Sequence, residues 1–126
     1  MKVSEGQKVL LVNKEPCDKN HYYSVTNLES IDYAALHLKG VAFQMWLYIA
    51  KNQNNYEFAL SCNAFMDWCG CSKPTYLSAV KELESKRFLV KEQHEEYKEY
   101  YRFYEMPGKD IAYPVDKDDI KVRFGV

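Results

Sequence analysis

No apolar stretch of this 126-residue chain is long enough to cross a lipid bilayer. The longest one, Val41–Ala50, is interrupted by Gln44 and falls well short of the roughly 20 residues that a spanning helix needs. The amino-terminal residues Met1–Lys8 also lack the apolar segment that forms the centre of a secretory signal peptide. We therefore expect a cytoplasmic protein that does not contact the membrane and whose cysteines stay reduced.

An excess of positive charge is also missing, because the formal net charge is -1. Domains that grip nucleic-acid phosphates usually carry a clear basic excess, so composition alone favours no nucleic-acid partner. Aromatic residues, in contrast, make up 15% of the chain, and 11 of them are tyrosines. Tyrosine suits half-buried sheets and interfaces, because its ring packs while its hydroxyl group stays hydrated.

Motifs that carry common enzymatic chemistry are absent from the sequence. It contains no glycine loop that could cradle a phosphate and no G-x-S-x-G turn for a nucleophilic serine. The histidines His21, His37 and His94 lie far apart in the chain, and none is near an obvious pair of acid and nucleophile. We therefore expect a protein that is not an enzyme, with no catalytic residues and no cofactor.

The cysteines do not follow a metal-binding pattern. Cys62, Cys69 and Cys71 contain no C-x-x-C pair, and no histidine is close to them in sequence. This spacing does not favour a zinc site, and no metal is expected. Cys17 falls in a polar stretch, where it could be an exposed thiol.

Two strand-like segments precede the helical part of the chain. Lys8–Val12 and Tyr22–Thr26 are rich in residues that favour strands, and Asn13–Asn20 between them is typical of a polar loop. Residues 27–32 are turn-like, and either Ser30 or Asp32 could cap the helix that follows.

Apolar residues recur at helical spacing from Tyr33 to Asn52. We expect Gly40 to divide this stretch into a short helix and a longer one. The longer helix is apolar on most sides, which is typical of a helix at the centre of a core. Trp46, and Trp68 further along the chain, are expected to lie in that core. Tyr56–Leu60 is another strand candidate.

Two helices with clear start and stop signals come next. Ser61 can cap a helix over Cys62–Cys69, and Gly70 can end it in a left-handed conformation. Ser72 can cap a second helix over Lys73–Lys86. The apolar stripe of this second helix consists of Tyr76, Ala79, Val80 and Leu83. Its outward positions include Lys73, Thr75, Leu77, Ser78 and Lys81, and Pro74 lies in its first turn.

A β-hairpin is predicted after the second helix. Its strands are Phe88–Gln93 and Tyr97–Glu105, and His94–Glu96 forms the tip. Alternation places Tyr97, Tyr101 and Phe103 on one face and Tyr100 and Tyr104 on the other. These aromatic residues fit cross-strand packing, or stacking on single-stranded bases with Lys98 and Arg102 as nearby cations. The tail from Met106 is turn-rich, then charged, and Ile120–Phe124 could form a final strand.

The stretch Gly70–Tyr76 resembles the turn and the start of the recognition helix in many bacterial winged helix-turn-helix regulators. Ala79–Leu89 resembles the end of that helix and the entry into the wing, and Leu38–Tyr48 resembles the first helix of winged domains in replication-initiation and primosome-loading proteins of phages, plasmids and other mobile elements. In this register Cys69 and Cys71 occupy positions that aliphatic core residues usually hold.

The resemblance implies an α+β winged-helix fold, with a core of three helices and a two-stranded wing. The winged-helix domain would cover residues 22–105, after an amino-terminal strand and polar loop over residues 1–21 and before a carboxy-terminal tail over residues 106–126.

The function that the resemblance implies is DNA binding, in a replication-associated or transcription-regulating role. The second of the paired helices would enter the major groove, and the hairpin would lie beside it. Double-stranded DNA is favoured as the ligand, and single-stranded DNA is the alternative. The expected DNA contacts are Lys73, Pro74, Thr75, Leu77, Ser78 and Lys81 on the helix and Lys91 and Lys98 on the wing.

Two features depart from the family pattern. Arg87 stands where the family prefers glycine, so it must adopt a left-handed conformation unless the helix ends differently. The wing tip carries Glu95 and Glu96 where a DNA-binding wing would favour basic residues.

The formal charge of residues 61–105 affects how strongly a single copy of the chain can bind DNA. This stretch contains 7 basic and 8 acidic side chains, a formal charge of -1. We therefore expect a homodimer or a larger complex to supply the affinity that one copy lacks. The alternative function is a winged helix used as a protein–protein interaction module, an inhibitor or adaptor with little affinity for DNA.

Overall fold

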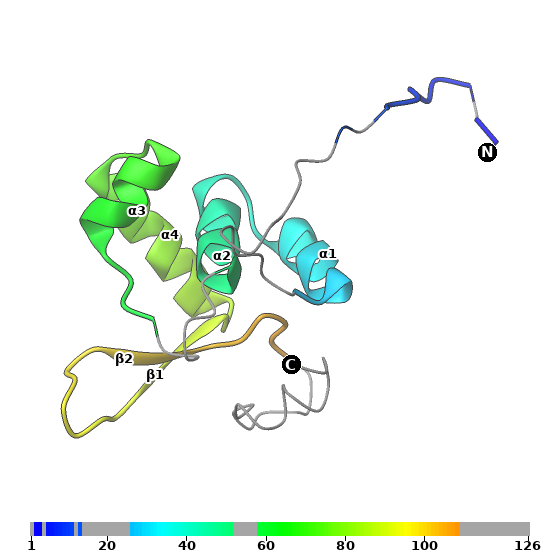
Figure 1. Cartoon of the computed structure of the whole chain (residues 1–126). Helices are drawn as coiled ribbons and strands as arrows, with labels where there is room; N and C mark the ends of the chain where they lie inside the picture. Colours follow the sequence, from blue (N-terminus) through cyan, green and yellow to red (C-terminus); the bar gives the residue numbers. More distant parts are fainter. Residues whose placement is uncertain (1, 4, 12, 14–25, 52–57, 109–126) are drawn as a thin grey trace.

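The structure, a computed structural model, describes residues 2–3, 5–11, 13, 26–51 and 58–108. Within these ranges, four helices precede a two-stranded antiparallel sheet (Figure 1). The elements are α1 (Leu28–His37), α2 (Val41–Lys51), α3 (Cys62–Cys69), α4 (Lys73–Ser85), β1 (Leu89–Glu92) and β2 (Tyr100–Phe103). The expected α+β class is confirmed, and the order of the elements is compatible with a winged helix.

Helix α1 begins at Leu28, not at Tyr33 as predicted. The side-chain oxygen of Asn27 accepts hydrogen bonds from the backbone N–H groups of Glu29, at 2.8 Å, and Ser30, at 3.2 Å. The prediction of Ser30 or Asp32 as the cap was wrong, because Asn27 already satisfies the free amides of the first turn. Gly40, with a φ of 56°, separates α1 from α2 as predicted.

The strands predicted before α3 are wrong wherever the structure describes them. Residues 8–11 form no strand, and the side chains of Leu10 and Leu11 are 77% and 91% exposed. Residues 58–60 and Thr26 form no strand either. β-favouring residues predict a strand only where a partner strand and a packing surface exist, and the described segments provide neither here.

Several predictions from the sequence lie outside the described residues. These are most of the predicted polar loop with Cys17, the greater part of the strand Tyr22–Thr26, residues 56–57, and the tail with its final strand Ile120–Phe124.

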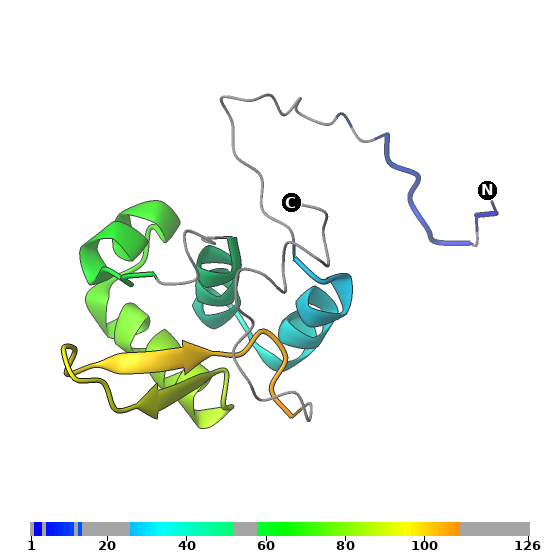
Figure 2. The same cartoon turned by 60° about the horizontal axis from the view of Figure 1, so that its bottom comes forward.

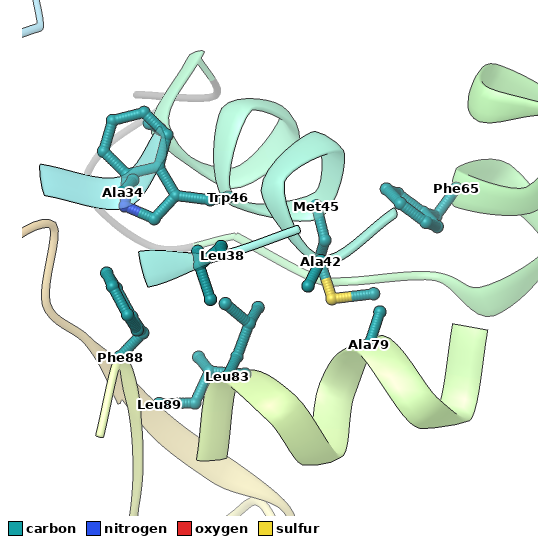
Figure 3. Close-up of a cluster of buried hydrophobic side chains, with 11 residues drawn as sticks. Ala34, Leu38, Ala42, Met45, Trp46, Phe65, Ala79, Leu83, Phe88 and Leu89 are labelled. Atoms are coloured by element: carbon teal, nitrogen blue, oxygen red, sulfur yellow. The ribbon is translucent and has the colours of Figure 1, made fainter. Parts of the chain in front are cut away.

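The hydrophobic core lies between α2, α4 and the start of the hairpin (Figure 3). Its largest fully buried side chains are Trp46, Phe65, Phe88, Leu38, Met45 and Leu83. Figure 3 shows Leu83 of α4 between Leu38 and Leu89, and Met45 of α2 above Ala79. The central position predicted for α2 is thus confirmed, whereas Trp68, expected in the core, is 46% exposed.

Helix α4 ends in a left-handed turn at Arg87, whose φ is 69°. The N–H of Arg87 donates to the carbonyl of Glu84 at 3.1 Å, and the N–H of Phe88 donates to the carbonyl of Leu83 at 2.9 Å. This pair of bonds defines a Schellman motif, which usually has glycine at the left-handed position. Leu83 and Phe88 are both fully buried, so they form the apolar contact that accompanies the motif.

The hairpin pairs Leu89 with Phe103 and Glu92 with Tyr100. It is joined to the helices where β2 ends, because the indole N–H of Trp46 donates to the carbonyl of Glu105 at 3.1 Å. In Figure 2 the hairpin runs beside α4, and its loop lies at the end of the molecule opposite α1. The loop therefore projects from a base that the core holds in place.

Candidate nucleic-acid interface

The turn between α3 and α4 sets the position of α4. Ser61 accepts a hydrogen bond from the backbone of Ala64 at 3.2 Å, and Gly70 ends α3 with a φ of 74°. Ser72 then caps α4 by accepting from the backbone of Thr75 at 3.4 Å. These caps are the ones that the sequence predicted, so the start of α4 is fixed by local signals.

Helix α4 has one buried face and one exposed face. Ala79 and Leu83 are buried, and Tyr76 and Val80 pack against the core. The opposite side is an exposed face made of Lys73, Pro74, Leu77, Ser78, Lys81, Glu84 and Ser85. These residues follow one another at steps of three and four or as neighbours, so they share one side of the helix. The apolar stripe predicted from the sequence is thus confirmed.

Thr75 and Leu77 differ from the other predicted DNA contacts on α4. Thr75 is only half-exposed, and its hydroxyl lies 3.0 Å from that of Ser72 within the cap. It therefore helps to begin α4 and has less freedom to contact a ligand. Leu77 is apolar and yet 48% exposed. Packing of α4 against the core therefore does not account for a leucine at this position.

The basic residues divide into two sets. Lys86 bonds to the carbonyl of His37 at the end of α1 and pairs with Glu82 at 3.8 Å, and Arg102 pairs with Glu92 through both its Nε and its Nη2. These two cations hold the fold together. The second set is exposed and forms no ion pair with any other residue that the structure describes; it consists of Lys73, Lys81, Arg87, Lys91 and Lys98.

Two carboxylates, Glu84 at the end of α4 and Glu99 just before β2, act on nearby tyrosines. Burial raises the pKa of the Tyr101 hydroxyl, and the negative charges of Glu84 and Glu99 raise it further. Burial also raises the pKa of Tyr76, with a smaller contribution from Glu99. Lys91 is the cross-strand partner of Tyr101, so the two side chains lie on the same face of the hairpin.

The wing tip differs from the predicted one. Strand β2 begins at Tyr100, so the alternation assumed from Tyr97 onward does not reach Tyr97. The prediction that Tyr97 shares a face with Tyr101 and Phe103 was wrong, because its ring stacks with Tyr100 at 6.1 Å and an interplanar angle of 11°. Tyr101 and Phe103 pack against the core instead.

Sequence reasoning also missed an aromatic patch between α2 and α3. Tyr48 lies 5.0 Å from Trp68 and 5.6 Å from Phe58, measured between ring centroids. The ammonium group of Lys51 lies over both rings, 5.3 Å from Tyr48 and 5.4 Å from Trp68. Only the spacing of Tyr48 and Lys51 on one helix could have suggested this contact.

The thiols of Cys69 and Cys71 pack against the core, in agreement with the sequence register, and burial raises the pKa of Cys71. In the described part of the chain, no group of three His, Cys, Asp or Glu side chains could hold a metal ion. Among the described helices, none is long and apolar enough to span a membrane.

The exposed face of α4 and the hairpin are thus the surfaces that carry the DNA contacts predicted from the sequence. Comparisons of the chain with protein-family models, with curated protein sequences and with solved structures find no match.

Proposed function

We propose that this chain is a winged-helix DNA-binding protein in which α4 enters the major groove of a duplex. The observation that carries the proposal is the exposed face of α4, on the second helix of a capped pair and beside an antiparallel hairpin. The major groove is about 12 Å wide, which admits an α-helix.

The side chains on this face have the chemistry that such a contact needs. Lys73 and Lys81 are separated by about 12 Å along the helix axis at 1.5 Å per residue, so they can reach phosphates at two places along the groove. Ser78 between them can donate to or accept from a base edge, and Leu77 can contact a thymine methyl group. Neither lysine forms an ion pair with a carboxylate of the described residues.

In this proposal the wing contributes fewer DNA contacts than α4. Lys91 stands next to α4 and can contact the DNA backbone, whereas Lys98 is followed by Glu99 and preceded by Glu95 and Glu96. Duplex DNA is favoured over single strands, because Tyr101 and Phe103 are packed against the core and cannot stack on bases.

A single copy carries little attraction for a polyanion, since residues 61–105 have a formal charge of -1. The proposal therefore includes a homodimer or a larger complex that brings two α4 helices to one duplex. A role in replication or in transcription regulation is proposed from the likeness of Gly70–Tyr76 and Leu38–Tyr48 to such proteins.

The proposal is tested by replacing both lysines on α4. We expect Lys73→Ala with Lys81→Ala to weaken binding to a random-sequence duplex and to reduce the slope of log K against log salt by about 2 for each copy bound. The matched control is Lys2→Ala with Lys8→Ala, which makes the same change in net charge at exposed residues remote from α4 in sequence. Equal losses in the two double variants, or no loss in the first, would contradict the assignment of α4.

The second candidate function is protein–protein interaction, and the acidic wing tip favours it. Glu95 and Glu96 repel phosphates at the position where a DNA-binding wing would approach the backbone. Retained affinity for a protein ligand together with no DNA binding at low salt would favour this candidate.

A further inference from the structure

Three aromatic rings gather at the loop of the hairpin. The ring of His94 lies 4.7 Å from that of Tyr97 and 4.5 Å from that of Tyr100, and the two tyrosine rings are nearly parallel. We call these three residues the tip cluster. Tyr97 is 52% exposed in spite of its two ring neighbours, so much of its aromatic surface faces solvent.

The loop that carries the tip cluster is held in one shape. The Nδ1 atom of His94 accepts a hydrogen bond from the backbone N–H of Glu96 at 3.1 Å. Directly next to the loop, Glu92 and Tyr100 are cross-strand partners and form the last pair of the hairpin register. A ligand at the tip therefore meets rings that are already positioned, which lowers the entropy that binding costs.

The charge around the tip cluster is negative. Glu95 and Glu96 lie between His94 and Tyr97 in the chain, both are exposed, and neither forms an ion pair with a described residue. Lys98 is the one base of the loop and is followed by Glu99. Exposed rings among carboxylates favour a cation, since the face of an aromatic ring attracts positive charge.

A cation already lies over aromatic rings at another place in this chain. On the α2–α3 side, Lys51 places its ammonium group over the rings of Tyr48 and Trp68. Over Tyr97, no lysine or arginine of the described residues takes that position.

We propose that the wing tip is a docking site for an arginine- or lysine-rich segment of a partner protein. A guanidinium or ammonium group stacks on Tyr97, and neighbouring basic side chains pair with Glu95 and Glu96. The site is distinct from the exposed face of α4, and it does not depend on DNA binding there. Nucleic acid is disfavoured at the tip, because its phosphates would approach these carboxylates.

The probe for this site is a fluorescein-labelled hexa-arginine peptide, titrated with the full chain and followed by fluorescence anisotropy. We expect Tyr97→Ala to raise the dissociation constant about tenfold, whereas Tyr97→Phe retains the ring and most of the affinity. Glu95→Gln with Glu96→Gln should weaken binding as well. The charge-matched control, Glu5→Gln with Asp67→Asn, should leave it nearly unchanged because both residues are remote from the loop in sequence.

Three results would overturn the proposal. Equal losses in the two acid-to-amide double variants would show attraction by net charge alone. Unchanged peptide affinity in Tyr97→Ala would show that the Tyr97 ring does not contact the peptide. Binding of an oligothymidine strand that Tyr97→Ala weakens, with no peptide binding, would assign the tip cluster to bases.

Failure of this proposal can be told apart from failure of the proposed function. The Lys73→Ala, Lys81→Ala variant should bind the peptide as the unchanged chain does, and Tyr97→Ala should bind duplex DNA normally. Loss of peptide binding on removal of the two lysines would contradict a separate site.

Discussion

Arg87 adopts a φ of 69°, in a region that costs an L-residue about 1–2 kcal/mol. The two hydrogen bonds of the Schellman motif and the buried contact between Leu83 and Phe88 hold it there. The chain keeps this turn because it directs β1 away from the end of α4. The strain resides in the backbone, since the Arg87 side chain is exposed and forms no described ion pair.

Arg87→Gly should therefore stabilise the protein. Glycine removes the left-handed strain but loses more backbone entropy on folding, so the net gain is expected to be about 0.5–1 kcal/mol. Urea unfolding of the two proteins measures it. Gly70→Ala is the reverse experiment: the φ at Gly70 is 74° and nothing would touch an added Cβ, so its expected loss of about 1 kcal/mol is a backbone effect. A less stable Arg87→Gly variant would contradict this explanation.

Two glutamates respond to burial and pairing in opposite directions. Burial raises the pKa of Glu105, and a hydrogen bond with Ser30 partly offsets this. The hydrogen bond and charge of Arg102 lower the pKa of Glu92. Because the folded pKa of Glu105 is above its unfolded value, this residue costs stability as pH rises through the folded pKa. Because the folded pKa of Glu92 is below its unfolded value, its stabilisation is lost as pH falls through the folded pKa.

The two substitutions Glu105→Gln and Glu92→Gln should therefore have opposite pH profiles. At about pH 7, Glu105→Gln should be more stable than the unchanged chain and Glu92→Gln less stable. Both differences should shrink in acid, where the carboxyl groups are protonated in the folded and the unfolded state. Denaturant unfolding at several pH values between neutral and acid gives the profiles. Differences that do not vary with pH would mean that packing, not ionisation, causes them.

At the scale of the element, the two faces of α4 have separate roles. Leu83→Ala should cost about 2–5 kcal/mol of stability, because it opens a cavity in a fully buried part of the core. Leu77→Ala on the exposed face should change stability by less than about 0.5 kcal/mol and weaken binding to duplex DNA. Thermal unfolding and DNA binding measured on both variants check this division. A large loss of stability in Leu77→Ala would place that residue in a structural contact instead.

The elements that sequence reasoning located well are those with local signals. Ser61, Gly70 and Ser72 marked the ends of α3 and α4 because their capping bonds involve only residues three or four positions away. Asn27 carried the same kind of signal and was overlooked, since Ser30 and Asp32 offered alternative caps within the same turn.

The elements that were mispredicted depend on partners distant in the chain. The apolar run Lys8–Val12 looks like a strand, but residues 8–11 pair with no described strand. Tyr97 looked like part of β2, but the hairpin register ends at the pair Glu92 and Tyr100. The pairing of Arg102 with Glu92 follows from that register, so it could be inferred only once the hairpin was aligned.

At the scale of the whole molecule, exposed lysines and exposed glutamates are concentrated on two different surfaces. Lys73 and Lys81, which form no ion pair with a described residue, lie on α4. Glu95 and Glu96, which form none with a described residue either, lie in the hairpin loop. The formal net charge of -1 does not reveal this arrangement, because the basic and acidic side chains nearly cancel in the sum. Local charge, not net charge, is what a polyanion meets at close range within a Debye length of about 8–10 Å.

A salt titration of the unchanged chain with a random-sequence duplex is the sharpest test of whether α4 binds duplex DNA. Binding is expected at low salt, with a log–log slope near -3 for each copy bound to the duplex, since Lys73, Lys81 and Lys91 each displace about 0.9 counterion from phosphate. Absence of binding at the lowest salt concentration, where attraction to phosphates is strongest, would contradict it.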